Sequence, residues 1–206
     1  MSDGLVFYTN PQSRGQIIRW LLEELGAPYE TVILDYGTTM KAPDYLAINP
    51  MGKVPAIRHK GQVVTECAAI CAYLADAFPE SGLLPAPQHR GAYFRWMFFA
   101  AGPLEAIFTA KAIGWEVPAD KQAMAGFGSF DLAIDTIESA VKGSTFIAGD
   151  SFSAADVYVS SLLDFMLRFG LLAPRPAFDA YLEPLRQRPA YIRAKEIDAA
   201  LIAAKG

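Results

Sequence analysis

NPMGKVPAIRHKGQVVTECAAICAYL, residues 49–74, contains two short apolar runs followed at once by a helical pattern. The runs at residues 54–57 and 63–64 flank a Lys-Gly turn, which predicts an antiparallel hairpin. Thr65 is placed to cap a helix that we expect over residues 66–77. The segment therefore predicts two paired strands followed directly by a helix.

Upstream of this segment, strand and helix patterns alternate. Residues 5–8 and 29–34 are short apolar runs that predict strands. Between them, apolar residues recur at helical spacing until Gly26, which ends the predicted helix. Because a single crossover joins the two strands, and such crossovers are right-handed, the strands should be parallel. Together with the hairpin, this pattern predicts an α/β sheet of about four strands.

The pattern changes after residue 77. Pro79, Gly82, Pro85 and Pro87 mark a linker. Beyond it the patterns are helical and no convincing strand is found. Helices are expected over residues 90–113, 121–142 and 154–169, followed by a last segment that prolines interrupt. We therefore predict an α/β domain at residues 1–79, a linker at residues 80–89 and an all-α domain at residues 90–206.

The composition excludes several classes of protein. The 206 residues are 52% hydrophobic and 19% charged, which is typical of a globular chain. A net charge of −4 argues against nucleic-acid binding, which needs a basic face. The N-terminus lacks the features of a signal peptide, and the most apolar later segment, residues 97–101, is too soon interrupted to span a bilayer. We expect a cytoplasmic protein that binds neither nucleic acid nor a membrane.

The two cysteines, Cys67 and Cys71, are too few for a disulfide framework. Four apart in a predicted helix, they would share one face, which leaves a metal or redox pair open. His59 and His89 stand alone in separate turn-like segments, so neither completes a metal site. We favour two small core residues and expect no metal.

Residues 8–14, YTNPQSR, join the first predicted strand to the first predicted helix. Polar groups at the start of a helix can donate hydrogen bonds to an anion, and the helix dipole favours that anion. Ser and Asn also cap helices routinely, so these residues alone leave a structural role open.

Two further features could bind a ligand. A cis peptide bond between Val54 and Pro55 would expose the Val54 backbone, although most X-Pro bonds are trans and the residues alone favour trans. The helix start near Glu66 offers N–H groups to a carboxylate, and Glu66 itself can accept from an ammonium group, the combination that an α-amino acid requires. An acidic first helical turn is also common for structural reasons. Ser153 and Asp156 have capping-box spacing, which we interpret as structural.

In this order, the segments resemble the cytosolic glutathione transferase superfamily over essentially the whole chain. Residues 49–55 are similar to the loop before the family's cis-proline strand, and residues 66–74 to its glutathione-binding helix. Residues 19–26 resemble its first helix, and residues 153–156 its C-terminal capping box. The resemblance, to bacterial beta-like and theta-like members, implies a thioredoxin-like α/β N-terminal domain plus an all-α C-terminal domain.

The resemblance implies glutathione as co-substrate and assigns residues to it. Val54, beside Pro55, would pair through its backbone with the cysteinyl part. Glu66 and the Cys67 N–H would hold the γ-glutamyl head group. The family usually has Ser in place of Cys67, so a hydroxyl contact is lost and we expect weaker glutathione binding.

Two lysines are placed like the basic residues that contact the glycyl carboxylate in theta-like members. They are Lys41 and Lys53. For each, a solvated loop charge is the alternative interpretation.

Three residues are candidates for activating the glutathione thiol. Ser13, our first choice, falls where beta-like bacterial members place their active-site Cys. Tyr8 matches the position of the catalytic Tyr in tyrosine-type members, and Arg14 would then help to stabilise a thiolate. Asn10 falls where theta-like members place their Ser. The alternative for Ser13 is that it only caps the helix.

The resemblance further implies a glutathione S-transferase that serves detoxification by attack of the glutathione thiolate on a small hydrophobic electrophile. Family members are typically homodimers. Aromatic residues within residues 93–115 would suit an electrophile pocket, although aromatics at helical spacing usually build a core. Two alternatives are a non-catalytic protein of the same fold that binds glutathione or apolar ligands, and a glutathione-dependent disulfide reductase.

Overall fold

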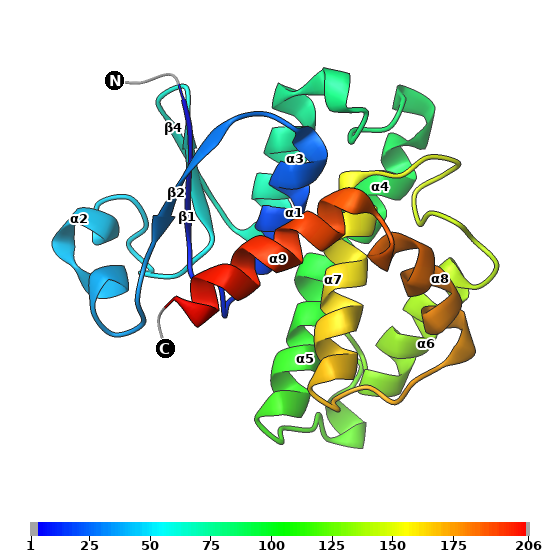
Figure 1. Cartoon of the computed structure of the whole chain (residues 1–206). Coiled ribbons are helices and arrows are strands. Elements are labelled where there is room, and N and C mark those ends of the chain that lie inside the picture. Colours follow the sequence, from blue (N-terminus) through cyan, green and yellow to red (C-terminus); the bar gives the residue numbers. More distant parts are fainter. Residues whose placement is uncertain (1–3, 205–206) are drawn as a thin grey trace. The chain divides into compact units, whose positions relative to one another are not determined.

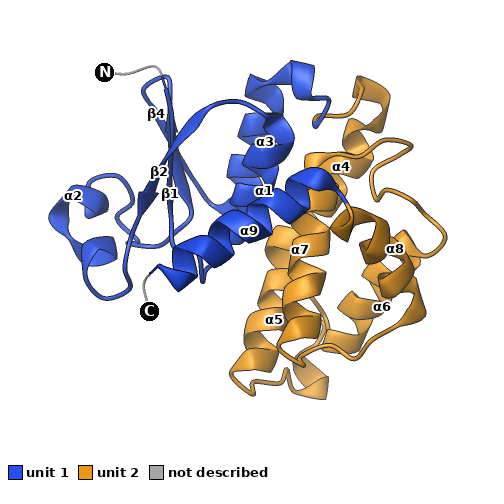
Figure 2. Cartoon of the chain, in the orientation of Figure 1, with its two compact units in different colours: residues 1–83, 188–206 blue, residues 84–187 orange. Residues whose placement is uncertain are grey.

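The computed structural model describes residues 4–204. The chain divides into two compact units (Figure 2). The first comprises residues 1–83 together with 188–206, and the second comprises residues 84–187. None of the helices within the described residues is both long enough and apolar enough to cross a membrane.

A four-stranded mixed sheet forms the centre of the first unit, with the strand order β2-β1-β3-β4. The strands are β1 (Leu5–Thr9), β2 (Tyr29–Ile33), β3 (Ala56–His59) and β4 (Gln62–Thr65). β1 pairs with β2 in parallel and with β3 in antiparallel, and β3 and β4 form an antiparallel hairpin. The predicted sheet is therefore confirmed in strand number, direction and hairpin.

Helices cover both faces of this sheet. Figure 1 shows α1 (Gly15–Leu25) and α3 (Cys67–Ala77) on one side and the short α2 (Pro43–Leu46) on the other. Every residue of β1 is buried, as expected for a central strand with both faces covered. Side chains alternate along it, so Phe7 faces α1 while Tyr8 packs in a cluster on the α2 side.

The ends of the two long helices of this region differ in how well the sequence predicted them. Gly26 ends α1 with a left-handed φ of 65°, as its residue type indicated. The predicted cap of α3 was wrong: Thr65 is the last residue of β4, and Glu66 occupies the N-cap position with a φ of 69°. The sequence could not predict this conformation, because Glu, like most non-glycine residues, disfavours a positive φ.

The C-terminal helix α9 (Pro189–Ala203) belongs to the first unit, although the sequence analysis grouped residues 188–206 with the helical domain. It packs along α1, where the Trp20 and Tyr191 rings meet edge to face with centroids 4.9 Å apart. Arg188 donates hydrogen bonds of 2.6 and 2.8 Å to the Glu24 carboxylate. The sheet and its covering helices therefore include an element that is distant in sequence.

The described part of the second unit contains helices and no strand, as predicted. Its α-helices are α4 (Arg90–Phe99), α5 (Glu105–Ala112), α6 (Phe130–Val141), α7 (Ala154–Arg168) and α8 (Pro176–Arg186). A π-helical turn, η4 (Ala100–Leu104), joins α4 to α5 and contains Pro103, which cannot donate a backbone hydrogen bond. The helix predicted from residue 121 begins only at Phe130, where the Ser129 hydroxyl caps it by accepting from Leu132 N.

The capping box at the start of α7 is confirmed. The Asp156 carboxylate is fully buried and accepts hydrogen bonds from Ile147 N (2.8 Å), Ser153 N (2.9 Å) and the Tyr181 hydroxyl (2.9 Å). Burial raises the pKa of Asp156, although these hydrogen bonds oppose the rise. The carboxylate ties α7, α8 and the preceding loop together, so its role in the structure is architectural.

Candidate active site

The β1–α1 junction is held together by its own polar groups. Asn10 Nδ2 donates to the Leu34 carbonyl at 2.8 Å, and Asn10 Oδ1 accepts from Gln12 N at 3.0 Å. Both ends of the Asn10 amide are therefore engaged in fixing the loop. In this conformation Asn10 has a structural role.

Ser13 lies at the start of α1 and is 8% exposed. Its hydroxyl donates to the Asn10 carbonyl at 2.7 Å and accepts from Gly15 N at 2.9 Å. The hydroxyl thus helps to cap the helix, and its proton is directed into the loop. To donate to a ligand, the Ser13 hydroxyl must exchange the Asn10 carbonyl for the new acceptor.

Tyr8 lies on the α2 side of the sheet, away from α1. Its ring packs against Tyr45, with centroids 5.7 Å apart. The Tyr45 hydroxyl donates to the Lys53 carbonyl at 2.5 Å, and burial raises the pKa of Tyr45 to about 12. Tyr8 therefore belongs to the cluster against which Val54 also packs, whereas the Ser13 hydroxyl is bonded within the β1–α1 junction.

The loop before β3 is fixed by side chains that the sequence analysis did not connect to it. Lys41 Nζ donates to the carbonyls of Gly52 (2.8 Å) and Met51 (3.2 Å). Asn49 Nδ2 donates to the Lys53 carbonyl at 2.9 Å. Lys41 is thus partly committed to holding this loop, whereas the Lys53 side chain is exposed.

The Val54–Pro55 peptide bond is cis. Residue statistics favoured a trans bond, which was wrong. The family resemblance implied a cis bond, which is confirmed. Pro55 is buried and Val54 is partly buried. Within residues 4–204, neither the N–H nor the carbonyl of Val54 has a hydrogen-bond partner. Both groups are therefore free to pair with an extended ligand.

The N-terminus of α3 combines backbone N–H groups at a helix start with a carboxylate. The first intrahelical bond of this turn runs from Ile70 N to the Glu66 carbonyl at 2.9 Å, so the N–H groups of residues 67–69 have no acceptor within the helix. The Glu66 side chain is exposed. Cys67 Sγ lies 4.0 Å from the Arg14 carbonyl. The starts of α1 and α3 therefore lie close together, which brings Ser13 and Arg14 into one region with Glu66 and Cys67.

The second cysteine takes no part in this region. Cys71 is completely buried, and burial raises the pKa of its thiol well above the usual value, with a smaller contribution from Cys67. Both cysteines are free thiols. No group of three or more potential metal ligands occurs within the described residues.

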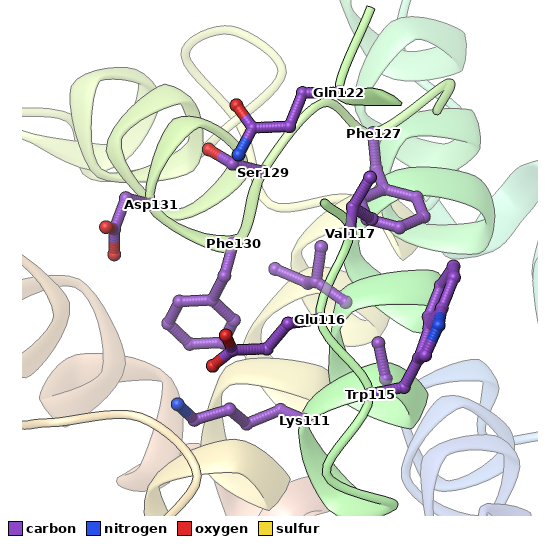
Figure 3. Close-up of a pocket in the computed structure, with 11 residues that line it drawn as sticks. Lys111, Trp115, Glu116, Val117, Gln122, Phe127, Ser129, Phe130 and Asp131 are labelled. Carbon is purple, nitrogen blue, oxygen red and sulfur yellow. The ribbon is translucent and has the colours of Figure 1, made fainter. Parts of the chain in front are cut away.

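The helical unit contains a cavity of about 220 Å³ (Figure 3). Among the aromatic residues that the sequence analysis considered, Trp115 lines it, while Tyr93 is fully buried in the core. Phe127 and Phe130 also line the cavity and were not predicted to do so, because they lie in a segment predicted as continuous helix.

A thioredoxin-like sheet, a cis-proline loop beside a helix N-terminus and a separate helical unit define the architecture of glutathione transferases. Residues 13–77 match the family model of the glutathione S-transferase N-terminal domain, and residues 100–189 match that of the C-terminal domain. The chain belongs to the cytosolic glutathione S-transferase superfamily and is classed as an enzyme of that family.

Individual relatives agree along nearly the whole chain. Glutathione S-transferase 3 of Zea mays is 28% identical over 203 residues, 91% of each chain. A solved glutathione transferase of Methylococcus capsulatus is 30% identical, with a TM-score of 0.79 over 95% of this chain and 99% of its own. A sphingomonad glutathione S-transferase solved in complex with glutathione is 29% identical, with a TM-score of 0.77 over 94% of this chain and 98% of its own.

Proposed function

We propose that this protein is a glutathione transferase that binds glutathione across the starts of α1 and α3 and activates its thiol. The observation that carries this proposal is the proximity of these two helix starts, marked by the 4.0 Å separation of Cys67 Sγ and the Arg14 carbonyl, beside the unpaired backbone of Val54. The glutathione bound to the sphingomonad relative supports the choice of ligand.

Each part of glutathione has a complementary group in this region. The γ-glutamyl carboxylate binds the N–H groups of the first turn of α3, and the exposed Glu66 carboxylate accepts from the ammonium group. The cysteinyl backbone pairs with Val54 as an added strand would. Lys53 is the better partner for the glycyl carboxylate, because Lys41 already donates to two carbonyls of the loop.

The thiol is activated by a hydrogen bond from Ser13 at the N-terminus of α1. A charge-assisted hydrogen bond contributes about 1.5–3 kcal/mol, whereas the neutral bond to the Asn10 carbonyl that it replaces contributes about 0.5–1.5 kcal/mol. The helix dipole adds about 0.3–1 kcal/mol. The net gain therefore corresponds to a thiol pKa lowered by about one unit, since one unit equals about 1.4 kcal/mol. Ser13 keeps its bond from Gly15 N throughout, because that bond uses the oxygen as an acceptor.

The test is a pH titration of the ultraviolet absorbance of the bound glutathione thiolate in the wild type, Ser13→Ala and Tyr8→Phe. We expect Ser13→Ala to raise the thiol pKa toward about 8.5, the value of free cysteine, while glutathione still binds. Tyr8→Phe is the matched removal of a hydroxyl and should leave that pKa in place. If only Tyr8→Phe raises it, the assignment to Ser13 is wrong. If the wild type binds glutathione with an unshifted pKa, the protein is a binding protein rather than a transferase.

The thiolate attacks a small hydrophobic electrophile, in a cytoplasmic detoxifying enzyme that acts as a homodimer. Exposed aromatic side chains on α4 support the dimer: Phe94 is 42% and Phe98 is 69% exposed, with ring centroids 6.4 Å apart. Contiguous exposed apolar patches mark interaction surfaces. Light scattering after size-exclusion chromatography should give twice the chain mass of 22.4 kDa, and Phe98→Ser should lower it. A wild-type monomer would contradict the dimer.

A further inference from the structure

The cavity in the helical unit is lined by three parts of the chain. They are helix α5, the segment of residues 115–129 and the first turn of α6. Ile107, Ala110 and Lys111 face it from α5, on the face that packs toward α6. The site therefore belongs to the helical unit alone and does not depend on the proposed glutathione site.

Three aromatic rings shape the cavity. Trp115 and Phe127 meet edge to face, with centroids 6.3 Å apart. Phe130 lies across from them, with Lys111 Nζ 5.1 Å from its centroid (Figure 3). Rings arranged in this way offer both faces and edges to a planar guest. A cavity of about 150 Å³ holds a benzene molecule. The volume of about 220 Å³ therefore fits one aromatic ring with a short polar chain.

The charged groups at one end of the cavity are of opposite sign. Figure 3 shows Lys111 and Glu116 together at this end, while Gln122 and Ser129 lie at the other. Within residues 4–204, neither Lys111 nor Glu116 takes part in an ion pair. A third charged residue, Asp131, also lines the cavity. A cation and an anion at one end of the cavity, neither of them in an ion pair, are complementary to a ligand that carries both charges.

We propose that this cavity binds a small aromatic zwitterion, that is, one ring carrying an ammonium and a carboxylate group on a short chain, as in an aromatic α-amino acid. The carboxylate pairs with Lys111, the ammonium group pairs with Glu116, and the ring lies between Trp115, Phe127 and Phe130. The Ser129 oxygen accepts from Leu132 N at 3.2 Å, which leaves its proton for a polar substituent on the far side of the ring. A ligand with one charge only would leave one of the two protein charges uncompensated.

The test is isothermal titration calorimetry of the full chain with L-phenylalanine and two single-charge analogues, phenethylamine and 3-phenylpropanoate. We expect saturable binding of L-phenylalanine, with each analogue weaker by about tenfold or more, since a charge-assisted bond is lost. Lys111→Met should weaken L-phenylalanine and 3-phenylpropanoate but not phenethylamine, and Glu116→Gln should show the reverse selectivity. Lys142→Met, which removes an exposed lysine outside the cavity, is the matched control.

A second variant separates this site from the proposed glutathione site, whose Glu66 could also meet an ammonium group. Glu66→Gln is expected to leave the affinity for L-phenylalanine unchanged. The proposal is overturned if L-phenylalanine does not bind, if all three compounds bind equally, or if Glu66→Gln rather than Lys111→Met and Glu116→Gln abolishes binding. Circular dichroism of each variant confirms that a loss reflects the site and not unfolding.

Discussion

The buried ion pair between α1 and α9 allows a sharp test of how the C-terminal helix is held. Arg19 Nε lies 3.4 Å from Asp198 Oδ1, and the two side chains are 2% and 4% exposed. Arg19 Nη1 also donates to Thr31 Oγ1 at 2.8 Å and to the Tyr29 hydroxyl at 3.0 Å. Phe7 lies under the guanidinium, 5.0 Å away. Asp198→Ala would leave the contacts of Arg19 with Thr31, Tyr29 and Phe7 in place but remove the countercharge.

The expected loss of stability follows from leaving Arg19 buried without its countercharge. Removing one partner of a buried pair costs about 3–5 kcal/mol because the other charge stays buried without compensation. Arg19 Nη2 and Asp198 Oδ2 have no hydrogen-bond partner within the described residues, so the pair is not fully compensated even in the wild type. The double variant Arg19→Met with Asp198→Leu removes both charges. We expect it to be more stable than Asp198→Ala by about 2 kcal/mol or more.

The assay is urea unfolding followed by tryptophan fluorescence and circular dichroism. Trp20 reports directly on this region, because its ring contacts Tyr191 of α9. The reasoning is refuted if Asp198→Ala costs less than about 1 kcal/mol, or if the double variant costs as much as the sum of the single variants Arg19→Met and Asp198→Leu.

The pH dependence of the same pair has a definite sign. Burial raises the pKa of Asp198 above its usual 3.8, against the attraction of Arg19. The folded protein therefore holds this proton more tightly than the unfolded chain, and the stability that Asp198 contributes falls as the pH rises from the unfolded to the folded pKa. Asp198→Asn lacks this titration, so the stability of the wild type relative to Asp198→Asn should decrease across that window and be constant above it.

Three further predictions concern the loop, the helix start and the capping box. Gly52→Ala should destabilise the first unit by more than about 1 kcal/mol in urea titrations, because φ is 55° and the new Cβ would lie 2.8 Å from Lys41 Nζ. Glu66→Gly should raise stability by up to about 1 kcal/mol by relieving the φ of 69°, yet weaken glutathione about tenfold or more in calorimetry; unchanged affinity would contradict the role of Glu66. Asp156→Ala should cost about 3 kcal/mol or more in thermal unfolding, because buried donors such as the Tyr181 hydroxyl lose their acceptor, and a loss below about 1 kcal/mol would contradict this.

The sequence predicted those parts of the fold that depend on local periodicity. The four strands, the hairpin, α1 and α7 were identified because alternation and helical spacing follow directly from which face is buried. The prediction that a helix begins at residue 121 was wrong, because Gly126 and Gly128 interrupt the segment before the Ser129 cap. The apolar pattern continues through these glycines and concealed the interruption. The grouping of α9 could not be predicted, since its contacts with α1 join residues far apart in sequence.

In the candidate site, too, the local features were predictable from the sequence and the contacts between distant residues were not. The residue types at Val54, Glu66 and Cys67 indicated the proposed glutathione site, because a helix start and an acidic side chain suit an amino-acid head group. The hydrogen bond from Lys41 to the Gly52 carbonyl could not be predicted from the sequence, because a loop lysine looks the same in sequence whether its side chain is solvated or bonded. Hydrogen-bond partners across a loop are set by backbone geometry and not by residue type.

The three candidates for thiol activation illustrate that limit most clearly. In sequence, Tyr8, Asn10 and Ser13 are equivalent polar groups within one short segment. In the structure, strand alternation turns Tyr8 toward the α2 side, and the Asn10 amide uses both of its ends to hold the loop. Ser13 is also bonded, but its donated bond ends on a neutral carbonyl, and a thiolate is a stronger acceptor than a carbonyl. Ser13 therefore remains the proposed donor to the thiolate, because exchanging a neutral carbonyl for a thiolate would gain free energy and leave the bond from Gly15 N in place.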